Sequence, residues 1–139
     1  MTTLTGSFDL DIPPEHAFAL FTPLGERQWV PGWDPQFPAP VHDDSAPGTV
    51  FQTDAQGRRA TWVVVDRTPP TRISYARVIE GMNAGTVSVA LERAGSGSVV
   101  EVTYDLTSLT DEGGRQLRAF ADDYPGFLGS WRTAIAARS

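Results

Sequence analysis

The 139-residue sequence contains no cysteine and no lysine, and each absence excludes a class of chemistry. Without cysteine the chain forms no disulfides, no thiolate zinc sites and no cysteine nucleophile. All 11 basic charges are arginines. Schiff-base catalysis and a phosphate-binding loop ending in Gly-Lys are therefore excluded as well.

The sequence is also poor in positive charge and in long apolar runs. The arginines are outnumbered by 17 acidic residues, which gives a net charge of −6 and a pI near 4.7. This balance opposes binding to nucleic acid or to an anionic membrane surface. The longest apolar run, residues 17–21, is far too short to span a membrane, and residues 1–4 lack the basic start of a signal peptide. We expect a cytoplasmic protein with neither nucleic-acid nor membrane partners.

The length and composition indicate one domain over residues 1–139 with a single core. Hydrophobic residues make up 40% of the chain and charged residues 20%, so the chain is too apolar for intrinsic disorder. The only shift in composition lies at residues 30–48, where five prolines occur among aspartates and glycines. Because Trp33 and Phe37 would be costly to leave in water, this segment is predicted to be an ordered loop.

Hydrophobic periodicity predicts six strands and two short helices in the first three quarters of the chain. Leu4, Gly6, Phe8 and Leu10 alternate with polar residues and indicate a half-buried strand. Two short helices should follow, one ending near Thr22 and one over 24–30. Five more strands are expected at 49–53, 60–66, 72–80, 86–93 and 99–107. Their short connections predict an antiparallel meander. In residues 62–65 both alternating sets are apolar, so the pattern does not determine which face of this strand points inward.

The last segment predicts a long amphipathic helix over about residues 111–137. Thr110 is a suitable N-cap, with acidic residues following in the first turn. The apolar stripe consists of Leu117, Phe120, Tyr124, Phe127, Trp131 and Ile135, at spacings of three and four residues. Such a helix would be about 40 Å long, enough to cross a six-stranded sheet. Pro125 should kink the helix or break it.

This order of elements resembles the helix-grip fold of the START-like superfamily. Two local segments strengthen the resemblance: residues 26–35 look like the helix-to-loop segment of a bacterial branch, and residues 102–113 look like its last-strand-to-helix junction. The resemblance covers nearly the whole chain and lies near the polyketide cyclase, lipid-transport and heat-shock-ATPase-activator branches. It implies an α+β fold in which a curled antiparallel sheet of about six strands surrounds a long C-terminal helix. It also implies an elongated cavity between sheet and helix for an apolar or aromatic small molecule.

No metal or catalytic motif is visible in the sequence. His16 and His42 lack the further ligands that a metal site would need, and the pairs Asp43-Asp44 and Asp122-Asp123 do not fit a calcium loop. We interpret all of these residues as solvated surface. Neither a metal nor an organic cofactor is expected.

Arg77 is the most interesting polar residue, because it shares a strand face with Ile73, Tyr75 and Ile79. If that face is inward, a buried guanidinium needs a partner, which a carboxylate or enolate of a ligand could provide. Alternatively the other face is inward, or Arg77 reaches solvent at the sheet edge. The residues alone favour this second interpretation. Tyr75 and Tyr104 either orient a ligand carbonyl or donate to backbone within the core.

The aromatic residues exceed what a small core obviously requires. Trp33 and Phe37 are predicted at a pocket rim, and Phe120, Tyr124 and Trp131 on its helical wall. The predicted ligand-binding residues are Trp33, Phe37, Trp62, Tyr75, Arg77, Tyr104, Phe120, Tyr124 and Trp131.

Three functions fit these observations. The leading hypothesis is binding of a small hydrophobic or aromatic molecule in the internal cavity, with Tyr75, Arg77 and Tyr104 orienting it. The enzyme alternative is a polyketide cyclase or aromatase, in which a tyrosine or arginine stabilises an enolate. Its weakness is that no histidine or carboxylate on a clearly inward strand face is available as a general base. The third is a chaperone-cofactor-like interaction module, which requires an exposed apolar patch, for example at residues 29–33.

Overall fold

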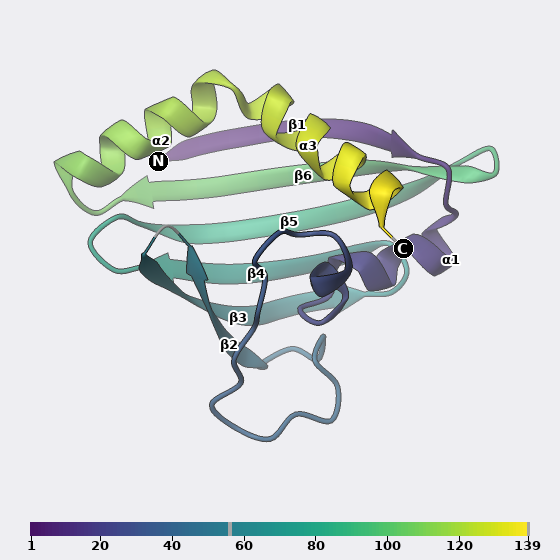
Figure 1. Ribbon diagram of the computed structural model, residues 1–139, viewed down its shortest axis with the longest axis horizontal. Coiled ribbons are helices and arrows are strands. Elements are labelled where there is room, and N and C mark those ends of the chain that lie inside the picture. Colours follow the sequence, from purple (N-terminus) through teal and green to yellow (C-terminus); the bar gives the residue numbers. More distant parts are fainter. Residues whose placement is uncertain (56, 139) are drawn as a thin grey trace.

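A curled six-stranded antiparallel sheet forms the body of the molecule (Figure 1). The computed structural model describes residues 1–55 and 57–138. The strands are β1 (Thr2–Leu10), β2 (Val50–Ala55), β3 (Arg58–Thr68), β4 (Arg72–Ile79), β5 (Asn83–Ala94) and β6 (Gly97–Ser108). Their order across the sheet is β1-β6-β5-β4-β3-β2, so the first strand joins the end of the predicted meander. The helix-grip α+β fold expected from the sequence is confirmed.

Two short helical segments follow β1, as predicted. The first consists of one α-helical turn, α1 (Pro14–Ala17), continued by the 3₁₀ helix η1 (Phe18–Phe21). It ends at Thr22, whose backbone is extended because it precedes a proline. The second is the 3₁₀ helix η2 (Gly25–Gln28). Such short helices are held by tertiary contacts rather than by their own propensity.

The C-terminal helix is broken into α2 (Asp111–Asp122) and α3 (Tyr124–Ala137). Thr110 caps α2 as predicted, because its hydroxyl accepts a hydrogen bond from the Gly113 backbone N–H at 3.0 Å. The break lies at Asp123, where φ is −130° and ψ is 39°. Pro125 explains it, since the proline ring would clash with a carbonyl one turn earlier but fits the first turn of a new helix. No helix of residues 1–55 and 57–138 is long and apolar enough to cross a membrane.

The two C-terminal helices cover only part of the sheet. Helix α3 packs on β1, and α2 packs on β5 and β6 (Figure 1). The face of β2 and β3 is covered instead by the loop after η2. In that loop the Trp33 ring contacts Phe51 and Trp62, and its indole N–H donates to the Pro23 carbonyl at 2.7 Å. The proline-rich segment is therefore ordered at Trp33 and forms part of the wall around the interior.

The inward face of β3 is now defined. Trp62 and Val64 are buried, Val63 is half-buried and Val65 is 48% exposed. A register shift between Val64 and Asp66 interrupts the ladder with β4. The Trp62 face of β3 points inward because the loop and the helices cover that face. The local sequence pattern of β3 contains no information about these coverings.

Candidate functional site

A two-lobed cavity lies between the sheet and its covering elements. One lobe of about 490 Å³ lies against α2, and the other, of about 460 Å³, lies against η2, the following loop and α3. We call them the helix lobe and the loop lobe. Arg77, Ile79, Tyr104 and Phe127 line both. The two lobes therefore meet at an arginine and a tyrosine.

Most walls of the cavity are apolar or aromatic. The helix lobe includes Leu106, Leu117 and Phe120. The loop lobe is lined in part by Val30, Trp33, Ala60, Trp62 and Trp131. Each lobe has a volume in the range of small-molecule sites, so an apolar or aromatic ligand would bury most of its surface here.

Arg77 lies inside the molecule, because β4 turns the face that carries it toward the cavity. Its guanidinium carbon lies 5.4 Å from the centre of the Trp62 ring and 5.7 Å from that of Tyr104. Nη2 donates a hydrogen bond to Asn83 Oδ1 at 2.9 Å, whereas Nε is buried without a hydrogen-bond partner. Burial lowers the pKa of the Arg77 guanidinium.

The interpretation of Arg77 favoured by the residues alone was wrong. Its strand face is the inward one, and the side chain does not reach solvent at the sheet edge. The sequence could not decide this, because the opposite face of β4 carries Ala76 and Val78 and is also partly apolar. Among the described residues, no carboxylate forms an ion pair with Arg77.

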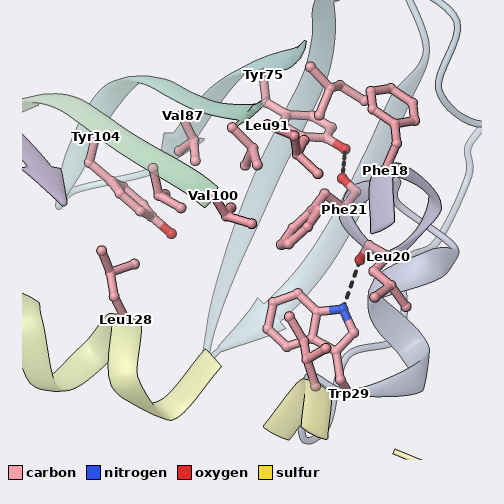
Figure 2. Packing of buried hydrophobic residues seen from close by; sticks show 14 of the residues in the cluster. Phe18, Leu20, Phe21, Trp29, Tyr75, Val87, Leu91, Val100, Tyr104 and Leu128 are labelled. Atoms are coloured by element: carbon pink, nitrogen blue, oxygen red, sulfur yellow. Dashed lines mark hydrogen bonds between the residues drawn. The ribbon is translucent and has the colours of Figure 1, made fainter. Parts of the chain in front are cut away.

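Tyr104 is the second polar group at the junction of the lobes. Its side chain is buried, and Figure 2 shows its hydroxyl pointing into the space between β6 and α3. The hydroxyl makes no hydrogen bond to any described residue. Burial raises the pKa of Tyr104, the Arg77 cation opposes that rise, and the negative charge of Glu26 adds to it. This phenol is free to bond to a ligand.

Glu26 is a site residue that the sequence reasoning missed. It lies in η2, lines the loop lobe, and has no ion pair or hydrogen bond from its carboxyl group to a described residue. Burial raises the pKa of this carboxyl well above its usual range. Glu26 lies on a short helix and not on a strand, so the alternation that identifies inward strand positions does not reveal it. A usable signal was the spacing of Glu26 to Trp29 and Val30, which a helical turn places on one side.

Three of the predicted ligand-binding residues do not line the cavity. The Tyr75 hydroxyl donates to the Phe21 carbonyl at 2.6 Å, as Figure 2 shows, which is the core-tyrosine alternative. The Tyr124 hydroxyl donates to the Val102 carbonyl at 2.7 Å. Phe37 packs on Phe51 and lines a shallow surface depression instead. The structure brings together the other six, which are Trp33, Trp62, Arg77, Tyr104, Phe120 and Trp131.

Among the described residues, the histidines and aspartate pairs singled out in the sequence line neither lobe of the cavity. His16, His42, Asp122 and Asp123 are exposed, and the described residues contain no group of three or more potential metal ligands. Asp43 instead ties the proline-rich loop to β3, because it accepts a hydrogen bond from Arg67 at 2.6 Å. That bond lowers the pKa of the Asp43 carboxyl.

Several solved structures share this fold. Protein MLL2253 from Mesorhizobium loti matches with a TM-score of 0.72 at 17% identity, over 97% of each chain. CalU16 from Micromonospora echinospora matches with a TM-score of 0.71 at 20% identity, over 99% of this chain and 76% of that one. The Aha1 dimer from Colwellia psychrerythraea has a TM-score of 0.68 at 17% identity, over 96% of each chain. At these identities the similarity concerns the fold alone.

The sequence also matches a family model directly. No curated protein matches it. The model for polyketide cyclases, dehydrases and lipid-transport proteins matches residues 1–135, which is nearly the whole chain. Together with the helix-grip architecture, this match shows that the chain belongs to the polyketide cyclase/dehydrase and lipid-transport family of the START-like superfamily.

Proposed function

We propose that this protein binds a small, mainly aromatic or apolar molecule that carries an anionic oxygen, in the cavity between the sheet and α2–α3. The observation behind the proposal is Arg77, a buried cation with a free Nε and with no carboxylate partner among the described residues. A buried charge is costly unless it is paired, and a ligand carboxylate, enolate or sulfonate would pair it. Membership of a family of polyketide cyclases, dehydrases and lipid-transport proteins supports the apolar part of this description.

The apolar walls would supply most of the affinity. Each Å² of ligand surface removed from water contributes about 25 cal/mol, and the rings of Trp33, Trp62 and Trp131 offer flat surfaces for an aromatic ligand. Arg77 and Tyr104 would orient the bound molecule. A cytoplasmic location and binding without a metal or organic cofactor are further parts of the proposal.

A pair of fluorescent probes tests the anion requirement. Anilinonaphthalene sulfonate is aromatic and anionic, whereas phenylnaphthylamine has the same rings without the sulfonate. We expect Arg77→Gln to weaken binding of the sulfonate by about tenfold or more, because a charge-assisted hydrogen bond is lost. Binding of the neutral amine should be unchanged. Titrations followed by fluorescence give both affinities.

Arg72→Gln is the matched control, since Arg72 lies on the same strand but is exposed. It should leave both affinities unaltered. Equal binding of the sulfonate to Arg77→Gln and to the parent protein would contradict the proposal. Native mass spectrometry of the freshly purified protein would show in addition whether a small molecule is already carried.

One observation supports the cyclase or aromatase alternative. The cavity contains the carboxyl group of Glu26 besides the cation of Arg77 and the phenol of Tyr104. The missing general base was the weakness of this hypothesis, and Glu26 is a candidate for it. Turnover of a bound ketone would distinguish an enzyme from a carrier.

The interaction-module alternative gains no such observation. It requires an exposed apolar patch around residues 29–33, but Trp29 is buried, and its indole N–H donates to the Leu20 carbonyl at 2.7 Å (Figure 2). Trp33 is only partly exposed and packs against Phe51 and Trp62. These tryptophans form part of the interior rather than a docking surface.

A further inference from the structure

The loop lobe contains a polar group that binding of an anion at Arg77 does not explain. The carboxyl of Glu26 lines this lobe without a hydrogen bond or an ion pair to a described residue, and the residue is half-buried. Val30, Ala60 and Phe127, which line the same lobe, have no polar side-chain atom to pair with it. A polar group left in this state is costly unless something else bonds to it.

The surroundings of Glu26 favour its protonated form. Asp54 of β2, Arg77 of β4 and Tyr104 of β6 line the same lobe, while α3 contributes only Phe127 and Trp131. Tyr75 of β4 is near enough for the Glu26 charge to raise its pKa. Asp54 and the two tyrosines offer no positive charge, and Arg77, the cation in this lobe, forms no ion pair with Glu26. Burial correspondingly raises the pKa of Glu26.

A protonated carboxyl has one O–H donor, and that of Glu26 has no acceptor among the described residues. We propose that the loop lobe is a second polar subsite, in which the protonated carboxyl of Glu26 donates a hydrogen bond to an oxygen of the ligand. The ligand class is then an aromatic acid with two separate oxygen functions, one anionic at Arg77 and one a hydrogen-bond acceptor at Glu26. This inference rests on the proposed function, because it places the anion at Arg77.

The subsite makes binding depend on pH. When Glu26 ionises, it loses the proton that it donates and brings a negative charge into a cavity that holds the ligand anion. Affinity for a ligand with the accepting oxygen should therefore fall as pH rises through the raised pKa of Glu26. For a ligand without that oxygen, affinity should fall only by the part that comes from repulsion between the ionised carboxyl and the ligand anion.

Two isosteric probes isolate the hydrogen bond. Methoxynaphthalene sulfonate has an accepting oxygen where ethylnaphthalene sulfonate has a methylene, and the sulfonate stays ionised throughout. Several positional isomers of each compound exist, and the isomer for which the methoxy and ethyl compounds differ most in affinity is used. Affinities are measured by calorimetry from mildly acidic to mildly basic pH. At acidic pH we expect the methoxy compound to bind about three- to tenfold more tightly, the range for one neutral hydrogen bond. The advantage should vanish at basic pH.

Three variants complete the experiment. Glu26→Gln keeps an N–H donor and should retain the methoxy advantage at every pH, whereas Glu26→Leu should lose it at every pH. Glu101→Gln removes the same charge from an exposed position on β6 and should behave as the parent protein.

Some results would overturn the subsite. The first is that the methoxy compound binds no more tightly than the ethyl compound. The second is that its tighter binding persists in Glu26→Leu, and the third is that the difference in affinity grows as pH rises. If the sulfonates still bind and depend on Arg77, the proposed function stands and only the subsite at Glu26 falls. If no sulfonate binds, both proposals fall together.

Discussion

Glu26 and Arg77 bring a carboxyl group and a guanidinium into one lobe of the cavity without forming an ion pair. Both residues are half-buried, and each retains hydrogen-bonding capacity that no described residue uses. Groups in this state reduce stability, and they are typical of binding and catalytic sites. At the scale of the residue, stability and proposed function therefore oppose each other.

The cost of Glu26 should appear as a pH-dependent stability difference. Its pKa is higher in the folded than in the unfolded chain, so the folded state holds this proton more tightly and the contribution of Glu26 to stability is greatest at acidic pH. The free energy of unfolding should fall as pH rises from the ordinary carboxyl pKa, about 4.3, to the raised one. Glu26→Gln cannot ionise, so it should be more stable than the parent at neutral pH and equal to it in acid.

Urea unfolding at a series of pH values measures this difference. Glu101→Gln, which removes an exposed carboxylate, serves as the control. The expectation fails if the free energies of unfolding of Glu26→Gln and Glu101→Gln depend on pH in the same way.

At the scale of the element, the start of α2 is held very close to the sheet. A Cβ added at Gly113 would lie 1.9 Å from the Met82 carbonyl oxygen, which belongs to backbone and cannot easily move. Thr110 reinforces the contact, because its hydroxyl also donates to the Gly81 carbonyl at 2.6 Å. The position of α2, and with it the helix lobe, depends on a glycine at this point.

Two adjacent glycines provide a matched test of this contact. Gly113→Ala should lower the free energy of unfolding by about 1–3 kcal/mol, the usual cost of overpacking. At Gly114 the nearest atom to an added Cβ is 3.6 Å away. Gly114→Ala should therefore raise stability by about 0.5–1 kcal/mol, through helix propensity.

Chemical denaturation of both variants decides the outcome. If Gly113→Ala were as stable as Gly114→Ala, the close approach of α2 to Met82 would not constrain the helix.

The periodic elements were predictable, and the short ones were only partly so. Alternation located the strands, and the apolar stripe with Pro125 predicted both the long helix and its break. The sequence predicts a short helix over 24–30, where η2 lies, but it predicts neither the 3₁₀ geometry of η2 nor the inward direction of Glu26. A single short turn carries too little periodicity to define a buried face, so packing against the sheet decides it.

At the scale of the whole molecule, the cavity exists because two different coverings share one sheet. Helices α2 and α3 cover β1, β6 and β5, and the loop with Trp33 covers β2 and β3. Arg77 on β4 lies where these coverings meet. The two lobes are thus formed by segments far apart in the sequence.

Occupying this cavity should stabilise the entire fold. At a free concentration of about a hundred times its Kd, anilinonaphthalene sulfonate should raise the free energy of unfolding by about 2.7 kcal/mol, because it binds only the folded chain. At that same concentration of the probe, the free energy of unfolding of Arg77→Gln should rise by less. Urea unfolding with and without the probe measures both. Bright fluorescence without any gain in stability would place the probe elsewhere than in this cavity.

The sequence by itself determined the composition limits, the order of the elements, the antiparallel meander and the long C-terminal helix with its break. These follow from local periodicity and from proline, which act over a few residues. Only the tertiary structure decided which polar side chains face the cavity. Tyr75 bonds to the Phe21 carbonyl, 54 residues away, while Tyr104 and Arg77 on the same sheet keep unused hydrogen-bonding groups. The physical reason is that burial and hydrogen-bond partners depend on distant segments of the chain, which no local pattern contains.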